Sequence, residues 1–558
     1  MMSGILCLAM CLNAVPGRQA LVEPPGGQTI DLKIGKKVLL PEQKVAGDTG
    51  INVLLDQAHQ AWFQAMWELP PLMMRSGFRV VTSFATLDST LDPNGKCRIR
   101  VPNGNRRPFA WVPNPKYNVA IVAQHDPNAQ GYLPEEIEEL KKFVKGGGGL
   151  ILSGAPVGDA QKLAVYPLNK VAQAFDASLT TETVAYNGRQ APVLSLGRDW
   201  RADREAEGKP VVGLRKYGKG YVILSGAPNL MGWVDNAPAG SPASQAKVMA
   251  ELKRLILLAA QGKKPVGGST RLPMADEGVG GPVYPEMEER VAGAVVYYAK
   301  NQFPKVLDTV RVDMKKLDEM VRNWTPSPAP KDPMFLILAA GYGGGWAVNI
   351  YEPKEVGIIA PDPDAILSIL AHEVAHTCYA GPTNDQGRAA GQLPEVFSEA
   401  HAGWFQRKGD TWRNPDNKGH EPNDLFSFDP DGTKLDLSNS DSYPYGQAWT
   451  KLWWLWQKLD EKYGPEWYPR WLWVKNMRWA ATPSKNLTWD EVVEDMSIAC
   501  GEDLFPFMNK IGTTLSKERF ASANFDGKTL NLPVAEIPMG KCGRAIVRKI
   551  GDFKKPLR

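Results

Sequence analysis

Two histidines and a glutamate stand at a spacing that suits the binding of a metal ion. Residues 371–380 read AHEVAHTCYA and contain an H-E-x-x-H pattern, in which His372 and His376 flank Glu373. On a helix, residues four apart project from the same side, one turn from each other. Two imidazoles in that arrangement suit two ligands of one tetrahedral Zn²⁺ ion. The chain has only six histidines, so a histidine-rich composition does not explain the pattern.

Glu373 follows the first histidine and is expected to lie beside the metal. A carboxylate in that place can take a proton from an attacking water molecule and later give it to a leaving amine. The sequence therefore predicts His372 and His376 as zinc ligands and Glu373 as the catalytic base. The alternative is an ordinary surface helix with a His/Glu face and no metal.

A catalytic zinc needs a third protein ligand and one open coordination position. The stretch LPEVFSEAHAGWF, residues 393–405, predicts a helix with a proline near its start. Glu395 and Glu399 lie four apart on one face of this helix, and either carboxylate is a candidate. His401, two residues further on, is a third candidate.

The segments around these residues predict a sheet that is followed by helices. PMFLILAA (333–340) and VGIIAP (356–361) have the composition of buried strands, and GYGGGWAVN (341–349) predicts a strand with a tight glycine turn. The H-E-x-x-H helix comes next, and the remainder is strongly helical. This order favours an α+β domain. Most of the tryptophans of the last third are expected to pack in its core, although exposed ones would suit a substrate groove.

The N-terminal half has a different pattern, in which strands and helices alternate. NVAIVAQ (118–124) and LILSGAP (150–156) are continuous apolar runs, and an amphipathic helix over 133–149 lies between them. Continuous apolar strands joined by helices are typical of a doubly wound parallel sheet. The predicted chain is therefore multidomain, with an α/β domain ahead of the α+β domain. Its expected segments are a signal peptide (1–20), a lead (21–48), the α/β domain (49–262), a Gly/Pro-rich linker (263–284), the α+β domain (285–520) and a tail (521–558).

Composition excludes several classes of partner. The net charge is +4 with no long basic run, which excludes nucleic acid as an expected partner. The short apolar run from Ile5 to Leu12 resembles the core of a signal peptide and predicts a secreted or periplasmic protein. An intracellular scaffold protein is the alternative. No later stretch has the apolar length of a transmembrane helix.

An H-E-x-x-H pattern followed by a glutamate-bearing helix resembles the gluzincin zinc metallopeptidases. The resemblance implies Glu395 as the third zinc ligand and Glu399 as the residue that orients a ligand histidine. The downstream stretch SYPYGQAW resembles the segment in which a gluzincin tyrosine stabilises the oxyanion, which implies Tyr445, with Tyr443 as the second choice.

The glycine-rich stretch before the zinc helix resembles the gluzincin edge strand that pairs with substrate backbone. The resemblance implies substrate contacts at Gly344, Gly345 and Trp346. A plain β-hairpin turn is the alternative for this stretch.

Residues 49–262 resemble the class I glutamine amidotransferase-like fold, through VLLDQAH, the run from NVAIVAQ to KKFVKGGGGLILSG, and GKGYVILSG. Active members carry a nucleophilic cysteine at a strand-to-helix elbow, where this chain has Ser153. The resemblance therefore implies the non-catalytic branch and a scaffold or binding role. A serine nucleophile would need a base, and His59 and His125 are the candidates.

An amidotransferase-like domain ahead of this H-E-x-x-H domain resembles the M60-like (enhancin-like) peptidases. The resemblance implies a zinc metalloendopeptidase that acts on proteins or glycoproteins, including mucin-like ones. The alternative is a catalytically inactive, peptidase-like binding or scaffold protein.

Overall fold

The N-terminal domain is built on a seven-stranded sheet in the order β2-β1-β5-β6-β11-β10-β9. The first five of these strands run parallel, and β10 is antiparallel to both of its neighbours. All residues of β1, β5 and β6 are buried, as their continuous apolar sequences predict. The strands are β1 (Asn52–Asp56), β2 (Arg79–Ser83), β5 (Val119–Gln124), β6 (Gly149–Gly154), β9 (Trp200–Ala206), β10 (Lys209–Tyr217) and β11 (Gly220–Ser225).

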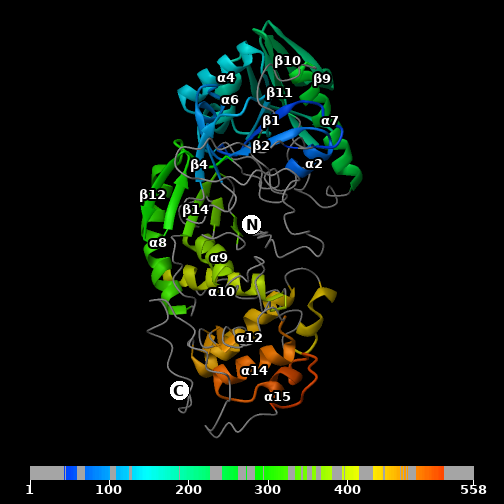
Figure 1. Ribbon diagram of the computed structural model, residues 1–558. Coiled ribbons are helices and arrows are strands. Elements are labelled where there is room, and N and C mark those ends of the chain that lie inside the picture. Colours follow the sequence, from blue (N-terminus) through cyan, green and yellow to red (C-terminus); the bar gives the residue numbers. More distant parts are fainter. Residues whose placement is uncertain are drawn as a thin grey trace.

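Helices cover both faces of this sheet (Figure 1). Leu54 and its neighbours on one face pack against α4 (Pro134–Gly146), whereas Val53 and Leu55 on the other face pack with α2 (Leu69–Arg75) and α7 (Pro242–Ala260). Alternation of side chains along each strand produces these two separate cores. The domain also contains α3 (Leu87–Leu91), α5 (Ala160–Val165), α6 (Pro167–Gln173) and two hairpins, β3 (Lys96–Arg100) with β4 (Phe109–Pro113) and β7 (Ala177–Tyr186) with β8 (Arg189–Leu196).

The C-terminal domain begins with a five-stranded sheet in the order β12-β13-β14-β16-β15. Strand β15 is the last in this order and pairs antiparallel with β16. The expected edge strand ahead of the H-E-x-x-H helix is therefore present. The strands are β12 (Met287–Val291), β13 (Ala294–Tyr298), β14 (Met334–Ala339), β15 (Gly345–Val348) and β16 (Glu355–Ile359).

Helix α8 lies between β13 and β14 in the chain and beside the sheet in Figure 1, whereas the later helices follow the sheet, and α12, α14 and α15 form the bottom of the molecule. Four tryptophans, Trp404, Trp456, Trp467 and Trp471, are among the largest fully buried side chains, which agrees with the predicted core role of this residue type. The helices are α8 (Pro304–Trp324), α9 (Ile366–Tyr379), α10 (Val396–Arg413), α12 (Gln447–Tyr463), α14 (Trp489–Cys500), α15 (Phe505–Lys510) and the 3-10 helix η2 (Leu437–Ser442).

The expectation of a multidomain chain that mixes helices and sheets is confirmed. This is a computed structural model, and the predicted signal peptide and C-terminal tail lie outside the residues it describes. Of the predicted linker, Val283 and Tyr284 form bridges with Ser83 and Arg98 of the N-terminal domain. The structure describes residues 43, 45–59, 69–100, 109–124, 128–187, 189–226, 242–261, 272, 283–292, 294–324, 334–340, 344–348, 355–359, 366–379, 393–394, 396–413, 432–443, 447–464, 467–468, 471–472, 474–475 and 486–520.

Candidate metal centre

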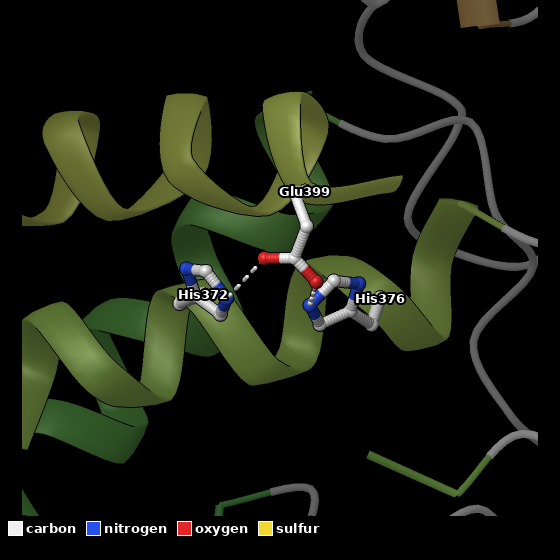
Figure 2. A group of neighbouring side chains, drawn as sticks. All are labelled: His372, His376 and Glu399. Carbon is white, nitrogen blue, oxygen red and sulfur yellow. Dashed lines mark ion pairs between the residues drawn. The ribbon is translucent and has the colours of Figure 1, made fainter. Parts of the chain in front are cut away.

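Helix α9 carries both histidines of the H-E-x-x-H pattern. Its apolar residues, among them Leu367, Leu370 and Val374, belong to the core of the C-terminal domain, and this burial fixes the rotation of the helix. His372 and His376 project from the same side, one turn apart (Figure 2). Only 5% of His372 and 2% of His376 is exposed, so both imidazoles are removed from bulk water.

Helix α10 packs against α9 and supplies a carboxylate to the two histidines. Glu399, in its first turn, places Oε2 3.5 Å from Nε2 of His372 and Oε1 3.7 Å from Nε2 of His376. One ligand atom from each of the three residues lies within 4.8 Å of the other two. Figure 2 shows the carboxylate between the two rings. Among the described residues, this is the group of three side chains that can hold one metal ion.

The third side chain of this group is Glu399, which the sequence offered as one of two candidate carboxylates. Glu399 was expected to orient a ligand histidine, but its carboxylate faces the ring nitrogens with which the two histidines would hold a metal. Glu395, the expected ligand, lies outside the described residues, and α10 begins at the residue after it. The alternative candidate His401 is buried elsewhere, because its Nδ1 contacts the Tyr468 hydroxyl and its Nε2 lies 3.1 Å from the carbonyl oxygen of Ala375.

Sequence reasoning missed a residue that orients His372. Nδ1 of His372 lies 3.1 Å from Oε1 of Gln406. An amide oxygen only accepts hydrogen bonds, so Nδ1 carries a proton and donates, which leaves Nε2 as the nitrogen that can bind a metal. Gln406 lies two helical turns after Glu399 on the same face of α10. That spacing, with a polar residue at each position, was the signal in the sequence that could have identified it.

The protonation of the two histidines differs because their surroundings differ. Burial lowers the pKa of His376 to about 3, which keeps its imidazole neutral and able to bind a metal. Burial also lowers the pKa of His372, but the carboxylates of Glu399 and Glu373 outweigh it, and the net shift is upward. A metal at this site therefore competes with a proton on His372, and binding should release that proton.

Glu373 is a buried carboxyl group with an unusual proton affinity. Burial raises its pKa to about 8, and the nearby Glu399 carboxylate acts in the same direction, while His372 opposes the rise. A carboxylate with a raised pKa is a stronger base than an exposed one, which suits proton transfer from water near neutral pH. A bound cation beside it would lower this pKa again.

The three side chains fit a transition-metal ion. Oε2 of Glu373 is buried and makes no hydrogen bond to any described residue. Buried polar atoms without partners are rare and call for an explanation such as a bound ion or water. Two imidazoles and one carboxylate are the donor set of many catalytic zinc sites. The same donor set also accepts other divalent transition metals, so the geometry is not specific to zinc.

The edge strand β15 lies directly against Glu373. A side chain added at Gly345 would have its Cβ 2.5 Å from Cγ of Glu373 and 2.6 Å from the carbonyl oxygen of Gly357. The absence of a side chain at this position is therefore what lets the strand approach the carboxylate. Gly344 precedes the strand with a φ of +125°, a conformation that favours glycine, and a Cβ there would meet open space.

Trp346 occupies a different place from the one expected of a substrate-binding residue. Its side chain leaves the opposite face of β15 and only 2% of the residue is exposed. The indole ring lies on Gly357, the residue paired with it across the strands. Trp346 is therefore a packing residue behind the strand, and the part of the predicted substrate stretch that faces Glu373 is Gly345.

Replacing Gly345 with alanine is expected to lower kcat by roughly ten- to a hundredfold, because the new methyl group must displace the Glu373 side chain, and small misplacements of catalytic groups have effects of this size. Zinc content should stay at the wild-type level, since no metal ligand is touched. Steady-state kinetics with metal analysis on the same samples checks this. Unchanged kcat in a zinc-loaded variant would show that the contact between Gly345 and Glu373 has no catalytic importance.

The predicted oxyanion-stabilising tyrosine, Tyr445, lies outside the described residues. Tyr443, the second choice, is described. Its hydroxyl accepts a hydrogen bond from the backbone N–H of Asp436 at 3.0 Å and donates one to the carbonyl of Lys434 at 3.4 Å. These contacts give Tyr443 a role in holding the turn before η2.

The alternative catalytic residues of the N-terminal domain are not arranged for nucleophilic catalysis. Ser153 lies near the end of β6, and its side chain is fully buried. Both ring nitrogens of His59 face carboxylates, Asp56 at 2.9 Å and Glu136 at 3.1 Å. Burial lowers the pKa of His59, but the two carboxylates have the larger, opposite effect, and the pKa rises to about 10. The ring is therefore held protonated and cannot serve as a base. His125 lies outside the described residues.

No family model matches this sequence, and no curated protein matches it. Solved structures match about a third of the chain. The cytoplasmic protein STM3548 from Salmonella typhimurium is 12% identical, with 37% of this chain and 97% of that chain covered at a TM-score of 0.22. An exo-beta-1,4-mannosidase from Opitutaceae bacterium strain TAV5 is 15% identical, with 36% and 35% covered at a TM-score of 0.22. At TM-scores this low, the similarity shows neither the fold nor the function of this chain.

Within the described residues, no helix combines the length and the apolar composition that crossing a membrane requires.

Proposed function

We propose that this protein is a metal-dependent peptidase of the gluzincin type, with Zn²⁺ as its cofactor. The observation that carries the proposal is the convergence of His372, His376 and Glu399 from two packed helices, with the buried Glu373 beside them. In this assignment the two Nε2 atoms and the Glu399 carboxylate hold the metal. When bound, zinc supplies Lewis acidity, which polarises the scissile carbonyl and makes water easier to deprotonate.

Other residues of the chain are proposed to transfer the proton, orient a ligand, bind the substrate and stabilise the oxyanion. Glu373 takes the proton of the attacking water and passes it to the amine of the leaving group. Gln406 fixes the tautomer of His372, so that Nε2 stays available. Among the described strands, β15 is an outermost strand of its sheet, and an extended peptide can add along its backbone as a further strand, next to Glu373. Tyr445 is proposed to stabilise the oxyanion.

The remaining expectations are part of the same proposal. The chain is proposed to be M60-like, secreted or periplasmic, and active on proteins or glycoproteins, including mucin-like ones. The N-terminal domain is proposed to have an amidotransferase-like fold without catalysis of its own. Both ring nitrogens of His59 face carboxylates, so this histidine is not available as a base, which supports a structural role for that domain.

Removing the metal tests the function. Exhaustive chelation is expected to abolish hydrolysis of a denatured protein substrate and of a mucin. One equivalent of Zn²⁺ should restore hydrolysis, because zinc binds imidazole ligands well and magnesium does not. Mg²⁺ serves as the control ion and should not restore activity. Hydrolysis that persists in metal-free protein would contradict the proposal, whereas zinc binding without hydrolysis of any substrate would favour the inactive binding-protein alternative.

A further inference from the structure

The two domains are joined by a continuous apolar layer that reaches the back of the candidate site. Phe84, the residue after β2 of the N-terminal domain, lies in one cluster with aromatic and aliphatic residues of β13, β14 and β15. Its ring stacks on the indole of Trp346, with 5.6 Å between the ring centroids and 19° between the planes. Only 2% of either residue is exposed. A side chain of the first domain is therefore packed directly against the strand that lies beside Glu373.

Trp346 is held from three directions. Its ring rests on Gly357 of β16, Phe84 covers it from the N-terminal domain, and its indole N–H points to Oε1 of Glu355 at 3.4 Å. The buried Glu355 also accepts a hydrogen bond from the Tyr284 hydroxyl at 3.2 Å. Gly345 is the neighbour of Trp346 and points to the opposite face, toward Glu373. The indole and the carboxyl group of Glu373 therefore lie on opposite faces of β15, at neighbouring residues of the strand.

Contacts around this stack keep the domains in one arrangement. The backbone N–H of Phe84 donates to the Val283 carbonyl at 3.0 Å, and the N–H of Tyr284 donates to the Arg98 carbonyl at 2.8 Å. The guanidinium of Arg98 lies between the rings of Trp111 and Tyr297, at 4.9 and 4.6 Å from their centroids. The backbone pairs hold the end of the linker on the N-terminal domain, and the contact of Arg98 with Tyr297 of β13 joins that domain to the second sheet.

We infer that Phe84 and Trp346 are positioning residues, through which the N-terminal domain holds the edge strand β15 against Glu373. The catalytic consequence rests on the function proposed above, whereas the positioning of the strand does not. The N-terminal domain is in this account a structural part of the active site rather than a separate module. Loss of the aromatic stack frees β15 to move away from the carboxyl, and substrate pairing with its edge weakens.

The cluster provides a matched control. Phe109 belongs to the same interdomain layer, but its ring packs on Tyr284, Tyr297 and Phe335, with centroid distances of 4.6, 4.8 and 5.2 Å. Tyr297 lies in β13 and Phe335 in β14, and Tyr284 is connected to Trp346 of β15 only indirectly, through the hydrogen bonds of Glu355. Phe109→Leu therefore removes an aromatic ring from the same interface by the same substitution. Both substitutions are expected to lower the melting temperature, Phe84→Leu by more, because Phe84 is fully buried and Phe109 is partly buried.

Hydrogen exchange and kinetics on the full-length, zinc-loaded proteins test the inference. Phe84→Leu should speed exchange of the β15 amides, residues 345–348, by about tenfold, whereas Phe109→Leu should change them by no more than about twofold. The KM for a peptide substrate should rise by about threefold or more in Phe84→Leu alone, with kcat less affected and zinc content unchanged. Equal exchange of these amides in the two variants, or no change in either, would overturn the inference.

The exchange measurement separates this inference from the proposed function. A wild-type protein that does not hydrolyse any substrate would contradict the function, while the exchange rates of β15 would still decide whether Phe84 positions that strand. An active wild type in which Phe84→Leu changes neither exchange nor KM would leave the function intact and reject the positioning role.

Discussion

Replacing Glu373 with glutamine is expected to lower kcat by about a hundred- to ten-thousandfold while the metal stays bound. Glutamine has nearly the shape of glutamate, but it cannot accept and return a proton, and general acid–base catalysis contributes an effect of this size. The pKa of Glu373, raised to about 8, indicates a carboxyl group whose proton affinity is suited to this exchange. Initial rates on a peptide substrate, with metal analysis of the same preparation, provide the measurement.

A Glu461→Gln variant is the control for this substitution. Glu461 lies on α12, 52% of its side chain is exposed, and it pairs with the exposed Lys458. An exposed ion pair of this kind contributes little, so the activity of the Glu461→Gln variant should equal that of the wild type. If Glu373→Gln keeps more than about a tenth of the wild-type kcat, the carboxyl group is not the base, and the buried Glu373 is then a structural residue.

Replacing Glu399 with alanine is expected to weaken zinc binding by more than about a hundredfold. Changes to residues that merely orient a ligand weaken metal binding by about ten- to a hundredfold, and removal of a ligand should exceed that range. Competition with a chromophoric chelator measures the affinity. The variant should also lose hydrolysis at limiting zinc, because His372 and His376 alone do not complete the site.

Glu395→Ala is the matched variant for this prediction. It removes the other glutamate that the sequence offered as third ligand, and it should bind zinc with nearly wild-type affinity. The opposite order, with strong loss in Glu395→Ala and weak loss in Glu399→Ala, would return the ligand role to Glu395. The two affinities measured side by side therefore decide between the assignments.

The sequence predicted most of the candidate site because one helix carries most of it. The H-E-x-x-H spacing places two imidazoles on one side of α9 whatever the helix packs against, so local geometry is sufficient for His372, Glu373 and His376. The edge strand could also be predicted, since a glycine-rich stretch between two apolar strands favours a tight turn and a short strand. The multidomain, mixed α/β character followed from the change of hydrophobic pattern along the chain.

The remaining features depend on contacts between elements that are distant in the sequence. Glu395 and Glu399 are equivalent in periodicity, and the start of α10 and its rotation on α9 place Glu399 at the histidines. Trp346 was expected to contact substrate because it lies in the glycine-rich stretch. Strand alternation turns it to the other face, where Phe84 from a different domain covers it. No pattern within one segment contains that information.

The central claim is that His372, His376 and Glu399 hold one zinc ion, and metal content measured by mass spectrometry tests it most directly. The protein is stripped of metal, refilled with Zn²⁺, and freed of excess. About one zinc per chain is the predicted result. A wild-type protein that retains no transition metal after refilling would contradict the claim, and the metallopeptidase proposal would fall with it.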